Sequence, residues 1–231
     1  MKSPHELLVL VQFRSGTQPS SGWEEYLGNL KRLPGAVRLV ENVATGEDVP
    51  MPMPLGPLVF DRLVQVVFPS RDALLAALQH DSLLTPAPSL ETGLQYAIAL
   101  ATHRKDLIAK DAAITPPLKR MSLQFPDPAK TRGEFQTWWT DVHGPKVAKL
   151  DALLGYSQIH VIAERCMYLA ENSPDIRFPD GVTELYLQSI ESMLATFQPQ
   201  GTGITGQAAQ MIHQLSPRIV REEVVQLPAD A

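Results

Sequence analysis

Two stretches of the sequence, LPGAVRLV at 33–40 and LLGYSQIH at 153–160, share one pattern of leucine, glycine and alternating residues. Each follows a segment whose apolar residues have helical spacing, and each leads into a run with the composition of a β-strand. Both therefore mark the exit of a helix into a strand. Their corresponding positions predict that the chain contains the same structural unit twice.

The segments around these stretches predict the same order of elements in both halves, strand, helix, strand, strand, helix, strand. In the first half we expect strands at 5–14, 36–43, 58–68 and 93–103, and helices at 22–33 and 71–80. In the second half we expect strands at 118–125, 155–163, 181–189 and 218–227, and helices that begin at 131 and 190. Thr131 and Glu134 have the spacing of a capping box, which marks a helix start.

This order predicts an α+β fold. A βαββαβ unit forms a four-stranded antiparallel sheet with both helices on one face, the ferredoxin-like arrangement. The other face must be covered, and two tandem units can cover each other, closing a barrel within one chain as a pseudo-dimer. We place the first repeat at 1–112 and the second at 113–231. The segment 198–214 reads as a glycine-rich loop plus a short helix, a candidate lid.

Composition excludes several classes of protein. The chain has 231 residues, 44% of them hydrophobic, with a formal net charge of −5. The absence of a dense lysine and arginine cluster argues against nucleic-acid binding. One cysteine cannot form an internal disulfide or a multi-cysteine metal site, and the six histidines are scattered without paired spacing. With no long apolar segment, we expect a cytoplasmic protein without a membrane span.

The stretch FQTWWTDVHGPKVAKLDALLGYSQ at 135–158 resembles the EthD-like family of the dimeric α/β-barrel superfamily. The resemblance extends over about residues 118–225. The first half lacks the His-Gly-Pro motif, so the resemblance places any polar function in the second half. The superfamily includes cofactor-free monooxygenases, lactone isomerases, polyketide cyclases and dehydratases, and its tandem members include haem proteins.

His143 is the first candidate for catalysis. Pro145 disfavours helical geometry at Gly144, so we expect the helix to kink or break there and to leave His143 near its end. Trp139 lies four residues earlier, and its indole would stand beside the imidazole. A partly buried imidazole can move a proton near neutral pH. The alternative is a histidine that only bonds a freed carbonyl.

The strand at 155–163 supplies further candidates, because Tyr156, Gln158 and His160 share one face. If Ile159 and Val161 pack on the helices, this polar row points into the barrel. Otherwise it faces solvent at a sheet edge. Two further strands would complete the binding site with three side chains, Glu184, Tyr186 and Arg120, of which the last could anchor a carboxylate or enolate. Glu184 could equally be a solvated rim charge.

These residues predict a cofactor-independent enzyme of the lyase or isomerase type, which transfers protons on a small aromatic or polyketide-like molecule. His143 would be the general acid and base, Tyr156, Gln158 and His160 would polarise the substrate, and Trp139 would form an apolar wall. One alternative is a non-catalytic ligand-binding or accessory protein of a degradation pathway. The other is a haem protein with His143 or His160 as axial ligand. We expect no metal site, and the superfamily resemblance suggests a homodimer.

Overall fold

The computed structural model describes residues 4–17, 21–47, 49, 53–110, 118–171, 173, 176–197 and 208–227. The first half contains β1 (His5–Phe13), α1 (Ser21–Lys31), β2 (Arg38–Ala44), β3 (Arg62–Phe68), α2 (Arg71–Leu78), α3 (Asp81–Leu84), α4 (Pro88–Glu91) and β4 (Leu94–Ile108). The second contains β5 (Leu118–Pro126), α5 (Arg132–Trp138), the π-helix η1 (Trp139–His143), α6 (Gly144–Val147), β6 (Leu153–Leu169), β7 (Gly181–Leu187), α7 (Ile190–Phe197) and β8 (Ile212–Val225).

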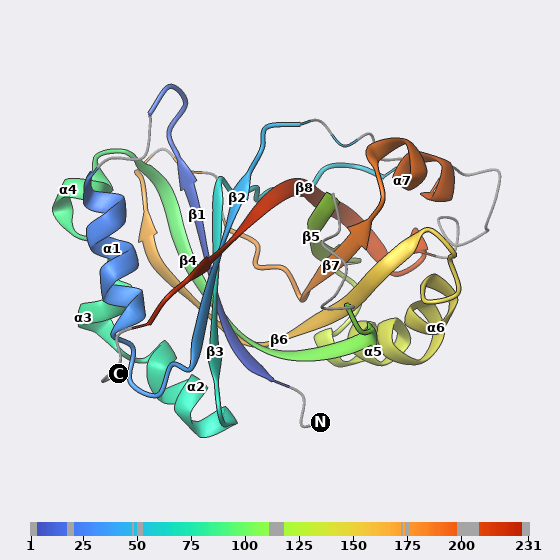
Figure 1. The fold of residues 1–231 in the computed structure, drawn as a ribbon, viewed down its shortest axis with the longest axis horizontal. Helices are drawn as coiled ribbons and strands as arrows, with labels where there is room; N and C mark the ends of the chain where they lie inside the picture. Colours follow the sequence, from blue (N-terminus) through green and yellow to red (C-terminus); the bar gives the residue numbers. More distant parts are fainter. Residues whose placement is uncertain are drawn as a thin grey trace.

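The strands form one closed antiparallel barrel in the order β1-β3-β2-β8-β5-β7-β6-β4. The two halves meet at two seams, where β2 pairs with β8 and β4 pairs with β6. Helices α1 to α4 cover one side of the barrel and α5 to α7 cover the opposite side (Figure 1). The predicted α+β barrel within one chain is confirmed.

Alternation along each strand divides the core into an inner and an outer layer. Leu8 and Leu10 of β1 belong to a buried cluster inside the barrel, with Met121, Leu123 and Ile159. Their neighbours on β1, such as Leu7 and Val9, pack outside against the helices. Because helices cover the outer surface, both faces of most strands are buried, and the strands read as nearly continuous apolar runs.

The observed elements differ from the expected ones mainly in length. β4 and β6 extend beyond the apolar runs that predicted them, because their polar continuations pair with each other along the seam from Tyr96 and Leu169 to Ile108 and Tyr156. The short helices α3 and α4 were not predicted. Of the candidate lid, residues 198–207 lie outside the described residues, and β8 already begins at Ile212 where a short helix was expected. Among the described residues, no helix has the length and apolar character needed to span a membrane.

Candidate functional site

The segment from Thr131 to Val147 carries the His-Gly-Pro motif. Thr131 and Glu134 form the predicted capping box at its start. Of the kink or break expected at Gly144, the break does not occur, because the helix continues as the π-helix η1 and then as α6. Pro145 lies in the first turn of α6, where a backbone N–H is not needed. Isolated π-helical turns are rare and occur frequently at functional sites.

The π-helix opens a place for a side chain from β6. The backbone N–H of Gly144 donates to the Trp139 carbonyl five residues earlier. Gln158 Nε2 donates to the same carbonyl oxygen at 2.7 Å, and it also donates to the Tyr156 hydroxyl at 2.9 Å. A Cβ at Gly144 would lie 2.6 Å from Gln158 Nε2, so glycine permits this contact. Gln158 thus ties η1 to β6.

The row of Tyr156, Gln158 and His160 faces the helices and does not point into the barrel. Ile159 and Val161, which would have to pack on the helices for this row to point inward, belong to the cluster inside the barrel. The alternative, a row that faces solvent, does not hold either, because every residue from Gly155 to Val161 is buried. With both faces covered, the two-residue period separates the faces without telling which is inside.

His143 does not stand beside Trp139. Its ring stacks on Trp138 at a centroid distance of 5.0 Å, because residues five apart are aligned in a π-helix. Burial and the nearby Lys146 lower the pKa of His143 to about 4. His143 does not line the groove onto which His160 opens.

His160 opens onto a groove outside the barrel wall, which we call the histidine groove. The groove has a volume of about 510 Å³ and is lined by His5, Arg71, His103, Lys105, Gln136, Thr137, Thr140, Asp141, His160 and Ile162. It therefore lies where β1, β4 and β6 approach α2, α5 and η1. His103 and His160 are partners in the pairing of β4 with β6, and the His5 and His103 rings lie 5.8 Å apart.

Burial determines the charge of the groove histidines. It lowers the pKa of His160 to about 4, and His103 and Lys105 act in the same direction. Burial, His5 and Lys105 lower the pKa of His103 as well. Both imidazoles are thus neutral near pH 7 and able to accept a proton, while Lys105 and Arg71 supply positive charge.

Trp139 packs against His160 and does not line the groove. Its side chain is 1% exposed, with its ring 4.9 Å from that of His160 and stacked on Phe135 at 5.3 Å. The indole reaches the backbone of β7 at Gly181, where an added Cβ would lie 2.4 Å from Trp139 Cζ3. Its role as an apolar wall for a substrate stays a prediction.

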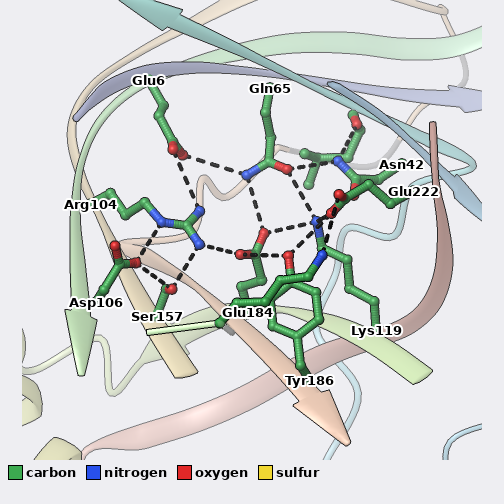
Figure 2. A network of polar contacts seen from close by, with 12 residues as sticks. Glu6, Asn42, Gln65, Arg104, Asp106, Lys119, Ser157, Glu184, Tyr186 and Glu222 are labelled. Atoms are coloured by element: carbon green, nitrogen blue, oxygen red, sulfur yellow. Dashed lines mark hydrogen bonds and ion pairs between the residues drawn. The ribbon is translucent and has the colours of Figure 1, made fainter. Parts of the chain in front are cut away.

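The remaining candidates lie on different faces of the sheet. Glu184 and Tyr186 point into one end of the barrel, where they join a network of charged side chains (Figure 2). Arg120 does not join them. It faces the helical layer, with its guanidinium 5.4 Å from the Phe197 ring and its Nε donating to Ser122 at 3.0 Å. Arg120 is thus separated from Glu184 and Tyr186, with which we expected it to line one site, and its role as an anchor for a carboxylate or enolate stays a prediction.

No group of three or more histidine, cysteine, aspartate or glutamate side chains in the described part of the chain is arranged to hold a metal ion.

Residues 127–208 match the family model of the EthD domain. The matched segment contains Trp139, His143, Tyr156 and His160, whereas His5 and His103 come from the other half of the chain. The histidine groove is thus shared between the matched segment and the first half.

Solved structures share the fold of this chain. An anthrone oxidase-like protein superposes with a TM-score of 0.61 at 10% identity, over 100% of this chain and 97% of that chain. A candidate monooxygenase of Fusobacterium nucleatum subsp. nucleatum gives 0.51 at 9% identity, over 96% and 94%. A chlorite dismutase point mutant of Candidatus Nitrospira defluvii gives 0.50 at 11% identity, over 95% and 92%. Among curated protein sequences, none matches this chain.

The lowered pKa of His160 predicts an acid-dependent loss of stability. An unfolded chain protonates this histidine below its ordinary pKa of 6.5, whereas the folded protein does so only near 4. The unfolded state therefore binds more protons as the pH falls through this window, and the folded state loses about 3 kcal/mol by pH 4.

Urea unfolding at pH 7, 6, 5 and 4 measures this loss, with His160→Gln as the reference. The wild type should lose about 3 kcal/mol more than the variant between pH 7 and pH 4. Parallel pH dependences of the two proteins would show that His160 has an ordinary pKa in the folded state.

Proposed function

We propose that this protein is a cofactor-independent enzyme that transfers protons on a small aromatic or polyketide-like molecule bound in the histidine groove. The reaction class is isomerisation, dehydration, cyclisation or lyase cleavage. The observation that carries the proposal is the pair His103 and His160, two neutral imidazoles on neighbouring strands beside Lys105 and Arg71. Acids and bases of this type need a pKa below or near the working pH to accept a proton.

The chemical step follows from these side chains. His160 removes a proton from a carbon next to a substrate carbonyl, and the electron pair of the C–H bond moves to make an enolate. Lys105 and Arg71 stabilise the negative oxygen in a partly enclosed site, where charge stabilisation is stronger than in water. The protonated His160 returns the proton at another atom, directly or after passing it to the neutral His103, so the step needs no oxidant.

The other expected residues take supporting roles in this proposal. Tyr156 is 1% exposed and Gln158 is fully buried, so they hold η1 against β6 rather than touch the substrate. Thr140 orients His160, since its Oγ1 lies 3.5 Å from His160 Nε2. His143 is the second candidate for the acid or base.

The proposal extends to the architecture and location. Residues 1–112 and 113–231 are two tandem ferredoxin-like repeats, supported by the strand orders β4-β1-β3-β2 and β8-β5-β7-β6 within one ring. The ring is closed by strands of one chain, so a homodimer would use a surface other than the sheet faces. The cytoplasm is the proposed location.

A haem does not fit the histidine groove. A porphyrin needs apolar surface against both of its faces, and Ile162 is the one hydrocarbon side chain among the lining residues in the described part of the chain. His143, the other candidate ligand, is stacked on Trp138. A non-catalytic ligand-binding protein is the second candidate function, because a groove with charged and neutral polar groups can bind a molecule without turning it over.

The test is a turnover screen of aromatic lactones and hydroxylated polyketides, followed by His160→Gln and His103→Gln. We expect each variant to lower kcat at least about 100-fold with an unchanged circular dichroism spectrum. His213→Gln is the matched control, because His213 is an exposed histidine on β8.

Each other outcome changes the proposal. Loss of activity in His143→Gln alone would move the proton transfer to His143. Saturable binding without turnover across the panel would make this a binding protein. A Soret band on hemin titration that disappears in His160→Gln would overturn the proposal.

A further inference from the structure

A second cavity lies inside one end of the barrel, and we call it the barrel-end cavity. Its volume is about 610 Å³, which is within the usual range for small-molecule sites. Each of the eight strands contributes at least one lining residue, and none of these residues lines the histidine groove. Figure 2 shows the charged side chains that converge there from different strands.

The buried cations of this cavity are already well paired. Arg104 contacts Glu184, Glu6, Asp106 and Ser157. Lys119 Nζ lies 3.0 Å from Glu184 Oε2 and 2.7 Å from Glu222 Oε2. An anionic ligand would have to compete with these carboxylates, so the deep part of the cavity is a poor anion site.

The buried carboxylates are not equally paired. Glu184 Oε1 contacts Arg104 and accepts from the Tyr186 hydroxyl at 3.2 Å, while its Oε2 contacts Lys119 and Gln65. Glu6 is only 4% exposed, yet its contacts, with Arg104 Nη1 and Gln65 Nε2, are both 3.5 Å long. Burial raises the pKa of Glu6, as expected for a carboxylate without close donors. Among the buried charged groups of this cavity, the Glu6 carboxylate is therefore the one that can still accept a close hydrogen bond.

Apolar side chains lie next to the charged groups of the cavity. Pro4, Val40, Val67 and Ala109 are among its lining residues, and Val67 is the cross-strand partner of Glu6. The cavity therefore offers hydrocarbon surface beside a carboxylate. A molecule that complements both has a cationic donor head and a short apolar body.

We infer that the barrel-end cavity binds a small primary amine, whose ammonium group donates to Glu6 and whose hydrocarbon part packs against Val40 and Val67. An ammonium group supplies both the positive charge and the N–H donors that Glu6 lacks. A neutral alcohol of the same length supplies a single donor without charge. The amine should therefore bind more tightly than the alcohol.

The test uses n-pentylamine as the probe and 1-pentanol as its neutral match, with calorimetry and backbone NMR at pH 8. We expect saturable binding of n-pentylamine at least about 10-fold tighter than that of 1-pentanol, because hydrogen bonds to charged groups are the stronger ones. The NMR shifts should map to the barrel ends of β1, β2 and β3. Glu6→Gln should weaken amine binding at least about 10-fold.

Two further variants test whether the amine binds in the barrel-end cavity. Glu41→Gln removes another buried carboxylate of the barrel, one that pairs with Arg62 and Trp23 away from this cavity, and it should leave amine binding unchanged. Val67→Phe fills part of the cavity beside Glu6 and Arg38 without adding or removing a charge, and it should abolish binding while the protein stays folded. The inference is overturned if n-pentylamine does not saturate, if 1-pentanol binds equally well, or if folded Glu6→Gln and Val67→Phe both keep wild-type affinity.

Discussion

Glu184→Gln is expected to lower the free energy of unfolding by about 3–5 kcal/mol, because it removes the carboxylate shared by two buried cations. Glu184 contacts Arg104 and Lys119, and its side chain is 1% exposed. Burial opposes its ionisation, but Lys119 and Arg104 together hold the pKa of Glu184 well below its usual range. The neutral amide keeps the shape of the side chain. It removes the negative charge that balances the positive charges of Arg104 and Lys119.

Urea unfolding at pH 7 measures this effect, with Glu223→Gln as the matched control. Glu223 pairs with Arg221 at 2.9 Å, but both side chains are largely exposed. An exposed pair contributes about 0–1 kcal/mol, so the control should unfold almost as the wild type does. A loss below about 1 kcal/mol in Glu184→Gln would show that water already screens the network.

Trp139→Ala is expected to cost about 3–5 kcal/mol of stability, the usual range for removal of a fully buried aromatic side chain. Trp139 packs between Phe135, His160 and the backbone at Gly181. Trp138→Ala is the control, because Trp138 is half-buried and contacts the edge of the same cluster. Trp138→Ala should lower the free energy of unfolding clearly less than Trp139→Ala does in the same experiment.

A double-mutant cycle separates packing at this position from a general weakening of the protein. Gly181→Ala alone should destabilise by about 1–3 kcal/mol, because its Cβ would collide with the Trp139 ring. In the Trp139→Ala background the collision partner is gone, so Gly181→Ala should cost far less. Additive effects of the two substitutions would contradict the close contact.

Much of the fold could be predicted because the apolar pattern repeats. LPGAVRLV leads into β2, LLGYSQIH forms the start of β6, and both strands occupy the second place in their half. Gly35 in the first of these stretches has a φ of +79°, a conformation that glycine adopts without strain. Turn chemistry and strand composition at such points are local, so the sequence alone reveals them.

The orientation of the candidate site could not be predicted in the same way. Tyr156 and Ile159 are both buried, one against η1 and the other inside the barrel, and alternation does not distinguish these two environments. The π-helix also changed which ring contacts His143, because it aligns His143 with Trp138 instead of Trp139. The residue types in this segment do not reveal that its spacing is five residues instead of four.

The barrel-end network was missed for a different reason. Glu6 is the one carboxylate in the largely apolar strand β1, and Lys119 lies in β5, in which every residue is buried, so each of these charges needs a buried partner. The partners, Arg104 and Glu184, are far away in the sequence. Only the strand order and register bring these four side chains together.

The two seams of the ring also determine how the chain must be assembled on a ribosome. While only the first half has emerged, β2 and β4 are the outer strands of an open sheet, and Leu8 and Leu10 on its inner face lack their cover. Unpaired strand edges and uncovered apolar faces are the surfaces through which nascent chains aggregate. The hazard ends only when β6 and then β8 leave the exit tunnel and pair with β4 and β2. The speed at which the second half is translated therefore controls how much of the newly made protein escapes misassembly.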